Sequence, residues 1–208
     1  MKIIKPSFVI EDIIDGEEIL KKLEKAGRTC YKSENDIKSG SSSEFIKKIL
    51  SMGHESVIEH EKITVRAICD RGVSHEIVRH RIGSYSQEST RYCNYGQDKF
   101  GKEITVIEPL FFEKGTVKWE SWRQAMQNAE DSYFSLLGSG AMPQEARSVL
   151  PNSLKTEIVI TYNLREWRHF LRIRTSKKAH PQIRELCIPI LSAFKRHVPA
   201  IFDDIVPE

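Results

Sequence analysis

The chain is poor in cysteine, and its four cysteines form none of the patterns that bind metal or build a disulfide framework. Cys30, Cys69, Cys93 and Cys187 are far apart, and no C-x-x-C pair occurs. A structural zinc site needs ligands at closer spacing. No secretory leader precedes these cysteines, so we expect reduced thiols in a cytoplasmic protein.

Long apolar runs, internal repeats and linker-like tracts are missing as well. The opening residues 1–6 are too few and too interrupted by charge for a signal peptide, and no apolar run approaches the roughly 20 residues that span a membrane. No low-complexity segment divides the chain of 208 residues. We therefore expect a single domain over residues 1–208, with no membrane partner.

The charge is modest in total but uneven along the chain. Hydrophobic residues make up 39% of the sequence and charged residues 29%, as in ordinary soluble proteins, and the formal net charge is +3. Basic residues gather in 66–91 and 165–184, whereas 11–18 and 203–208 are acidic. Local positive charge of this kind attracts anions without making the whole protein a binder of polyelectrolytes.

Hydrophobic periodicity and capping residues predict a mixed α/β fold. Alternating and β-branched runs favour strands, while apolar residues at helical spacing, capped by Ser43, Asp70 or Asn163, favour helices. Gly83 is expected to end the helix that Asp70 begins, which leaves 84–91 as a loop or irregular strand. The expected strands are 3–10, 63–69, 104–107 and 157–162, and the expected helices are 16–26, 44–51, 71–82, 117–137, a short one from Pro143, 163–175 and 181–197.

The strongest functional signal is a cluster of cationic residues near the end of the expected helix 71–82. Arg79, His80 and Arg81 are followed, after seven residues, by Ser89. Guanidiniums without partners bury poorly in an apolar core, but a planar fork of donors that is always charged suits phosphates and ring carbonyls. The segment therefore favours a site for an anionic nucleotide.

On a straight helix Arg79 and Arg81 point to nearly opposite sides, because successive residues turn by about 100°. One ligand cannot easily use both arginines, whereas two ligands, or one ligand and a neighbouring subunit, can. The simpler alternative is a solvated ion-pair face, since Glu76 stands three residues before Arg79 and four before His80.

Arg174 extends an apolar stripe. Trp167, Phe170, Leu171 and Arg174 fall at i, i+3, i+4 and i+7 of the expected helix 163–175. This spacing directs the guanidinium towards the interior, where it needs an anionic or carbonyl partner. The alternative is that Arg174 snorkels to solvent at the end of the helix, where a cation is also favoured.

The same helix carries further cations on its other faces. The i, i+4 pair Arg165 and His169 is suited to a second ligand, and Asn163 and Arg165 at the helix start offer backbone donors for a phosphate or a pyrimidine edge. Elsewhere, Arg147 lies at the margin of the buried side of a short helix, a position typical of a surface arginine.

Other chemistries are less well supported. His54 and His60 flank a string that resembles a metalloprotease motif, but they are six residues apart instead of four, so they diverge by about 240° on a helix. We therefore predict no metal site. Ser89 lacks the G-x-S-x-G context of a hydrolase nucleophile. Binding of RNA or a single strand would need aromatic platforms among the cations, and tyrosines between 85 and 95 keep this hypothesis open.

An Arg-His-Arg triplet followed by seven residues and a serine resembles the signature of the flavin-dependent thymidylate synthases. Further segments resemble this family, in order, over about residues 50–185. These segments are 53–60, 146–151, 163–165, 171–174 and 180–182.

The resemblance implies that the protein methylates deoxyuridylate (dUMP) to thymidylate (dTMP), with 5,10-methylenetetrahydrofolate as carbon donor, a tightly bound FAD, and NADPH as reductant. It also implies the α/β fold of that family, with a central mixed sheet and long helices. The expected assembly is a homotetramer whose active sites combine residues from several subunits. Nucleic acid is not an expected partner.

Carried over by position, Arg174 is the expected catalytic residue and polarises the uracil ring, while Arg91 and Arg147 suit the phosphate. Ser89 is expected to bind or polarise, without attacking the ring. The residues expected at FAD are His54, Ser56, Arg79, His80, Arg81, Gln87, Asn163, Leu164, Arg165, His169 and His180. The residues expected at dUMP are Glu76, Arg79, Gln87, Glu88, Ser89, Thr90, Arg91, Arg147 and Arg174. Glu76, Gln87 and His169 differ from the residue types that family members often carry, and Lys177 and Lys178 precede His180 as two extra residues.

Overall fold

The computed structural model describes residues 1–208 and combines helices with β-strands, which confirms the predicted mixed α/β class. The residues pack into two compact units. Unit 1 comprises residues 1–8, 67–79 and 85–159, and unit 2 comprises residues 9–66, 80–84 and 160–208. The expectation of a single domain stays a prediction.

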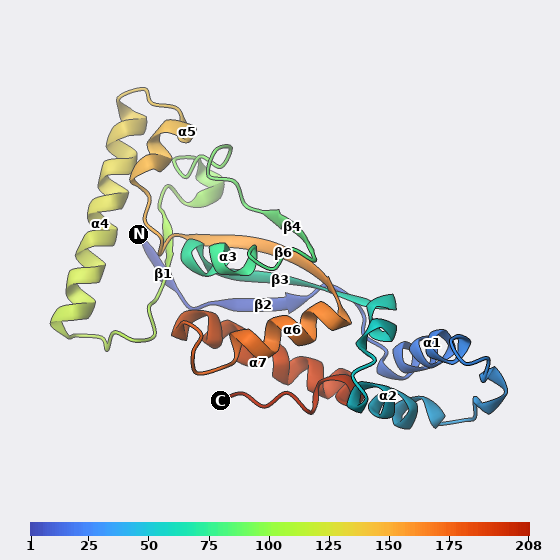
Figure 1. Ribbon diagram of the computed structural model, residues 1–208. Coiled ribbons are helices and arrows are strands. Elements are labelled where there is room, and N and C mark those ends of the chain that lie inside the picture. The colour runs from blue at the N-terminus through green and yellow to red at the C-terminus, as the bar shows by residue number, and fades with distance from the viewer. The chain divides into compact units, whose positions relative to one another are not determined.

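Eight α-helices and six strands make up the regular structure (Figure 1). The helices are α1 (Gly16–Thr29), α2 (Ser41–Ser51), α3 (Arg71–Ile77), α4 (Val117–Gly138), α5 (Pro143–Ala146), α6 (Leu164–Arg174), α7 (Pro181–His197) and α8 (Pro199–Phe202). The strands are β1 (Lys2–Ile4), β2 (Ser7–Ile10), β3 (Lys62–Asp70), β4 (Ser84–Gln87), β5 (Thr105–Ile107) and β6 (Lys155–Asn163). Short 3₁₀ turns are η1 (Glu34–Asp36), η2 (Glu55–His60), η3 (Asp98–Phe100) and η4 (Arg147–Val149).

The strands form two sheets. The smaller sheet pairs β1 with β5 in parallel, with Ile3 opposite Val106. The larger sheet has the order β2-β3-β6-β4, so strands far apart in the sequence become neighbours. The chain passes between the two units within the long strands β3 and β6.

Unit 1 has a core in which α4 covers residues near β5. Val106, Met126 and Tyr133 are among its buried members, and the partly buried Trp122 packs against them. Trp122, Met126 and Tyr133 follow helical spacing along α4, which places them on one side of the helix. Thr116 caps this helix by accepting a hydrogen bond from the backbone N–H of Trp119.

Unit 2 has an aromatic core around α6 and α7. Trp167 is fully buried, and its indole N–H donates to the backbone carbonyl of Ile63 at 2.8 Å. Phe170 and Phe194 pack edge-on against this indole, with ring centroids 5.7 and 5.1 Å away. Edge-on packing and a satisfied indole donor both stabilise a buried tryptophan. The helix that carries Leu164, Arg165, His169 and Arg174 is therefore firmly anchored.

Sequence patterns located most elements, including α7 at its exact predicted bounds, but three predictions were wrong. The expected opening strand 3–10 is two strands, because Pro6 between them lacks the N–H that a continuous ladder needs. The cap of α2 is Gly40 in the left-handed region (φ 80°) instead of Ser43, so this helix begins earlier. Asp70 does cap α3, but α3 ends at Ile77 and not near residue 82.

None of the four cysteines forms a disulfide. No helix combines the length and apolar character needed to cross a membrane.

Candidate functional site

The predicted site residues fall into two groups, one in each unit. Unit 1 carries Glu76, Arg79, Gln87, Glu88, Ser89, Thr90, Arg91 and Arg147. Unit 2 carries His54, Ser56, His80, Arg81, Asn163, Leu164, Arg165, His169, Arg174 and His180. Most residues expected at dUMP lie in unit 1 and most residues expected at FAD lie in unit 2, with Arg79, Gln87 and Arg174 as the exceptions.

The Arg-His-Arg triplet lies beyond the end of α3, so the argument from helical rotation does not apply to it. Arg79 and Arg81 are exposed, whereas His80 between them is buried. Gly83 follows closely, and a Cβ at this position would lie 2.3 Å from ring atoms of Tyr162. Only glycine permits this approach of the backbone to the ring, so Gly83 lets the segment turn against β6.

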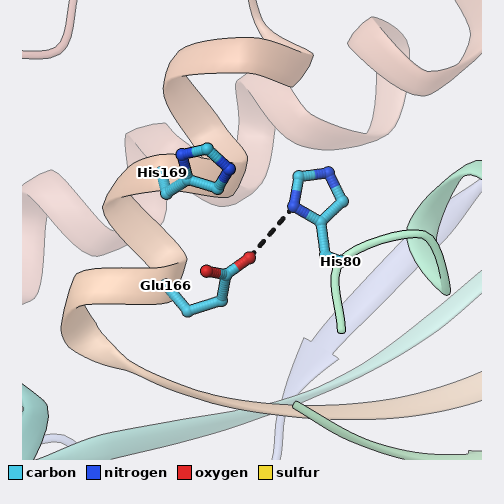
Figure 2. A group of neighbouring side chains, drawn as sticks. All are labelled: His80, Glu166 and His169. Carbon is cyan, nitrogen blue, oxygen red and sulfur yellow. Dashed lines mark hydrogen bonds and ion pairs between the residues drawn. The ribbon is translucent and has the colours of Figure 1, made fainter. Parts of the chain in front are cut away.

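His80 is held at both ring nitrogens. Its Nδ1 lies 3.0 Å from Oε1 of Glu166, and its Nε2 accepts a hydrogen bond from Nε of Arg174 at 3.1 Å. Figure 2 shows His80 on its loop facing Glu166 and His169, which both project from α6. The ring also packs edge-on against Phe170, with centroids 4.8 Å apart. Polar and aromatic contacts together fix the imidazole.

The surroundings of His80 favour its neutral form. Burial is the largest influence and lowers the pKa of His80, and the positive charge of Arg174 lowers it further, while the hydrogen bond to the Glu166 carboxylate acts in the opposite direction. Donor and acceptor atoms of His80, Glu166 and His169 lie within 4.8 Å of one another, a grouping that is compatible with a metal ion. Sequence spacing did not indicate this group, because His80 stands 86 residues before Glu166.

Arg174 is less buried than the apolar residues that precede it on its stripe. Trp167, Phe170 and Leu171 are buried as predicted, whereas Arg174 at the end of α6 is partly exposed. Its guanidinium is nevertheless directed by His80 and does not simply extend into solvent. The structure thus combines both interpretations of the sequence, because the group is anchored inside while part of it remains accessible.

A cleft of about 430 Å³ in unit 2 collects three of the predicted FAD residues, namely Asn163, Arg165 and His169. The predicted i, i+4 pair Arg165 and His169 therefore lies on one surface. Glu59 contacts Nη1 of Arg165 at 2.5 Å, and this carboxylate raises the pKa of the exposed guanidinium. The cleft is lined by Glu55, Glu59, Ile82, Asn163, Arg165, Glu166, His169 and Arg172.

A larger cleft of about 740 Å³ in unit 2 lies between α1, α2 and η2. His54 and Ser56, both predicted at FAD and both exposed, line it together with cations such as Arg28 and Lys48. Because η2 is a tight turn, its successive residues face different sides. His54 and Ser56 line this larger cleft, while Glu55 lines the smaller one.

In unit 1, Gln87 and Glu88 are fixed by neighbours. Nε2 of Gln87 donates to the hydroxyls of Ser74 at 2.9 Å and Thr156 at 3.1 Å. Glu88 accepts from Nζ of Lys155 at 2.6 Å and from the Tyr95 hydroxyl at 2.9 Å. Burial and then the negative charge of Glu88 raise the pKa of Tyr95, which keeps this hydroxyl a donor.

The residues from Ser89 to Arg91 form a turn near α5. Thr90 is buried, and Ser89 Oγ accepts from the backbone N–H of Arg91 at 3.3 Å. Nε of Arg91 donates to the side chain of Gln144 at 3.2 Å. Since Gln144 stands three residues before the exposed Arg147, the two predicted phosphate-binding arginines lie near the same short helical segment.

Three predicted FAD residues form hydrogen bonds that stabilise the first turns of α6 and α7. Asn163 caps α6 by accepting from the N–H of Glu166, and Nδ1 of the exposed His180 accepts from the N–H of Gln182 in α7. Leu164 is fully buried, and its N–H donates to the carbonyl of Glu61 at 2.9 Å. The side chain of Leu164 therefore faces the core and not a cleft.

Sequence analysis missed Glu166 and Arg168. An Asn followed three residues later by Glu is the pattern of a capping box, yet the Glu166 carboxylate bonds to His80. Arg168, placed by its spacing away from the apolar stripe, is only 1% exposed. Its guanidinium forms two hydrogen bonds with Asp204, at 2.6 and 2.7 Å, and donates to the carbonyl of Ile201. No local pattern reveals partners 86 and 36 residues away.

Comparison with known proteins gives independent evidence of the family. The model of the Thy1 family, described as thymidylate synthase complementing protein, matches residues 13–200. A flavin-dependent thymidylate synthase of Geobacter sulfurreducens is 36% identical over 190 residues, covering 88% of this chain and 80% of the relative. One of Pyrococcus furiosus is 34% identical over 176 residues, covering 84% and 67%. One of Corynebacterium glutamicum is 31% identical over 210 residues, covering 92% and 80%.

Proposed function

This chain belongs to the Thy1 family and is a flavin-dependent thymidylate synthase that converts dUMP to dTMP, and we propose that it does so by reductive methylation with FAD, NADPH and 5,10-methylenetetrahydrofolate. Bound FAD supplies the hydride transfer that neither the side chains nor the pyrimidine can provide. The protein residues bind, orient and polarise.

The proposed roles follow the two groups of residues. FAD is held by His54, Ser56, Arg79, His80, Arg81, Gln87, Asn163, Leu164, Arg165, His169 and His180, and dUMP by Glu76, Arg79, Gln87, Glu88, Ser89, Thr90, Arg91, Arg147 and Arg174. Leu164 contributes by supporting the start of α6 from the core, since its side chain is buried and its N–H is bonded to the carbonyl of Glu61.

The donors in unit 2 fit a dinucleotide cofactor. The smaller cleft presents Arg165, His169 and Arg172, whose donors suit the negatively charged diphosphate that joins the two halves of FAD. In the larger cleft, Phe45 and Ile49 provide an apolar wall and the hydroxyl of Ser56 provides a polar group. Such a combination of apolar walls with a few polar groups is usual in cofactor sites.

The donors in unit 1 fit the phosphate of a mononucleotide. Arg91 and Arg147 are both exposed, and Arg91 is steadied by Gln144 and by the ring of Tyr92, 5.3 Å from the guanidinium carbon. Two guanidiniums neutralise the charge of a phosphate and bind its oxygens through paired hydrogen bonds. The Ser89 hydroxyl is half-buried beside them and serves to bind or polarise the substrate.

The observation that carries the proposal is the anchored guanidinium of Arg174. Burial and the bond to His80 hold one side of this group, which leaves it preorganised at the end of α6. A fixed positive charge beside the uracil ring stabilises the negative charge that develops there when the ring is reduced, without reorganisation during the reaction. No residue of the protein needs to attack the ring.

The proposed assembly is a homotetramer whose active sites combine residues of several subunits. The exposure of both Arg79 and Arg81 supports this, because exposed arginines on either side of a buried residue are available to different ligands or subunits. Light scattering after gel filtration should give four times the 24.0 kDa mass of the chain. A monomer at working concentrations would contradict the shared-site proposal.

The decisive experiment compares flavin content with turnover in wild-type protein, Arg174→Ala and a control. Purified wild-type protein should show a flavin band near one FAD per chain and should form dTMP from dUMP when given NADPH and methylenetetrahydrofolate. Arg174→Ala should keep the flavin band and lose turnover. Arg196→Ala removes an exposed arginine from the last turn of another helix, α7, and should change neither.

Two results would overturn the proposal. Wild-type protein that stays colourless after FAD is added would exclude flavin chemistry. Unchanged dTMP formation by Arg174→Ala would exclude the role given to this guanidinium.

A further inference from the structure

We propose that Glu166 is a positioning residue that fixes one tautomer of His80 and, through it, the orientation of the Arg174 guanidinium. The inference rests on the proposed role of Arg174 at the pyrimidine. Glu166 has no direct part in that role, and its effect passes through the imidazole.

The first argument is geometric. Glu166 lies in the first turn of α6 and Arg174 is its last residue, about 12 Å away along the helix axis at 1.5 Å per residue. The imidazole of His80 bridges this distance, with Glu166 at Nδ1 (3.0 Å) and Arg174 at Nε2 (3.1 Å). The side chains of His80 and Glu166 are only 6% and 8% exposed. The three groups therefore form a continuous chain, and its His80–Glu166 part has little access for water.

The second argument concerns protons. The guanidinium of Arg174 has only donors, so Nε2 of His80 must offer a lone pair to make the observed bond. In a neutral imidazole the single proton then lies on Nδ1, from which it is donated to Oε1 of Glu166. An ionised carboxylate accepts and never donates, so Glu166 permits only this tautomer. The bond to Arg174 depends on it.

The third argument compares the Glu166 carboxylate with the amide of a glutamine at the same position. Glutamine at position 166 is nearly the same size but carries both a carbonyl and an NH₂ group. If the NH₂ group faced Nδ1 of His80, the ring proton would move to Nε2 and would meet the N–H of Arg174. Two donors cannot share a hydrogen bond, so the guanidinium would swing away. Aspartate is shorter but still only accepts, and it preserves the tautomer.

A metal ion bound by His80, Glu166 and His169 is the competing interpretation of this cluster. A ligating imidazole needs a lone pair directed at the metal. Both nitrogens of His80 are already engaged, one as donor to Glu166 and one as acceptor from Arg174. The arginine charge beside the ring also opposes a second cation. The geometry therefore favours the hydrogen-bonded chain from Glu166 through His80 to Arg174 over a metal centre.

The test compares Glu166→Gln and Glu166→Asp with wild-type protein. Glu130→Gln serves as the matched control, because Glu130 is also 8% exposed and is paired with the amino terminus at 3.0 Å in unit 1. In protein labelled with ¹⁵N-histidine, the two ring nitrogens of His80 report the tautomer directly, and loss of signals in His80→Asn assigns them among the seven histidines. Circular dichroism and flavin content establish that each variant folds.

We expect a single Nδ1–H tautomer in wild-type protein, Glu166→Asp and Glu130→Gln, and a mixed or reversed tautomer in Glu166→Gln. The kcat of Glu166→Gln should fall about 10- to 100-fold, the value of one charge-assisted hydrogen bond, with a smaller change in KM for dUMP. An unchanged tautomer in Glu166→Gln, or displacement of the Nδ1 proton by added Zn²⁺ in wild-type protein, would overturn the inference. If wild-type protein itself made no dTMP, the proposed function would fail. The tautomer measurement would still show whether Glu166 fixes the tautomer of His80.

Discussion

Replacing Asp204 by asparagine tests how strongly the carboxyl-terminal segment is bound to the helix of the candidate site. Arg168 on α6 is 1% exposed, and two hydrogen bonds of 2.6 and 2.7 Å join its guanidinium to both oxygens of Asp204. Arg172 adds a third bond to Asp204 at 3.0 Å. Asp204→Asn keeps the size of the side chain and removes the charge that balances the buried guanidinium.

The expected loss of stability is about 2–3 kcal/mol. Removing one partner of a buried ion pair costs roughly 3–5 kcal/mol, because the other charge is left buried without compensation. Here the loss is smaller for two reasons. The side chain of Asp204 is 55% exposed, which weakens its contribution, and Glu55 stays 3.4 Å from Arg168. A chain of about 200 residues loses roughly 2–4 °C in melting temperature per kcal/mol, so we expect a fall of about 4–12 °C.

Urea titration and calorimetry at equal protein concentration measure this change, since assembly makes the melting temperature depend on concentration. Asp203→Asn is the control, because Asp203 is an exposed neighbour with the same substitution. A double variant with Arg168→Met removes the buried charge as well and should recover part of the loss. A loss below about 0.5 kcal/mol in Asp204→Asn, equal to that of Asp203→Asn, would refute the reasoning, because surface substitutions typically fall in that range.

Acidity gives a further prediction for the same pair. Arg168 lowers the pKa of Asp204 below its ordinary value of 3.8, so the stability that the pair provides is complete above that value and is lost as the pH falls through the lowered pKa. The acid limb of a stability curve should therefore be shallower in Asp204→Asn than in wild-type protein. The protonation of His80 also lowers the stability as the pH falls, but it does so at a higher pH. Burial, helped by the charges of Arg174 and His169 and opposed by Glu166, lowers the pKa of His80 from 6.5. Protonation therefore favours the unfolded chain, and stability should decline as the pH falls below about 6.5, as urea midpoints at pH 7.5 and 5.5 will measure. Gly83→Ala places a methyl group 2.3 Å from the ring of Tyr162 and should cost about 1–3 kcal/mol by overpacking, which thermal unfolding will detect.

The sequence was informative where local rules decide the structure. Asp70 and Asn163 were recognised as helix caps because their side chains accept hydrogen bonds from N–H groups only three residues away. The buried stripe of α6 followed from residue spacing in the same way, and Trp167 and Phe170 are buried as predicted. Such contacts lie within one helical turn, so that periodicity and residue type suffice to find them.

Local rules failed where distant partners decide. The helix after Asp70 was expected to continue to residue 82, yet it stops at Ile77, and His80 turns instead towards α6. Glu166 occupies a position typical of a capping box, but its carboxylate is committed to His80. In both cases the competing interaction joins segments that are 86 residues apart, and no periodicity encodes it. The buried stripe that leads to Arg174 could be predicted from the sequence, whereas the groups that hold its guanidinium could not.

The turn η2 belongs to two clefts at once, because His54 and Ser56 line the larger and Glu55 and Glu59 line the smaller. This short 3₁₀ helix and its cap thus form a wall that the two clefts share. A displacement of this wall that widens one cleft narrows the other, so the two volumes change together at this wall. For any substitution in η2 that is designed to enlarge one cleft, ligand binding should be measured at both clefts.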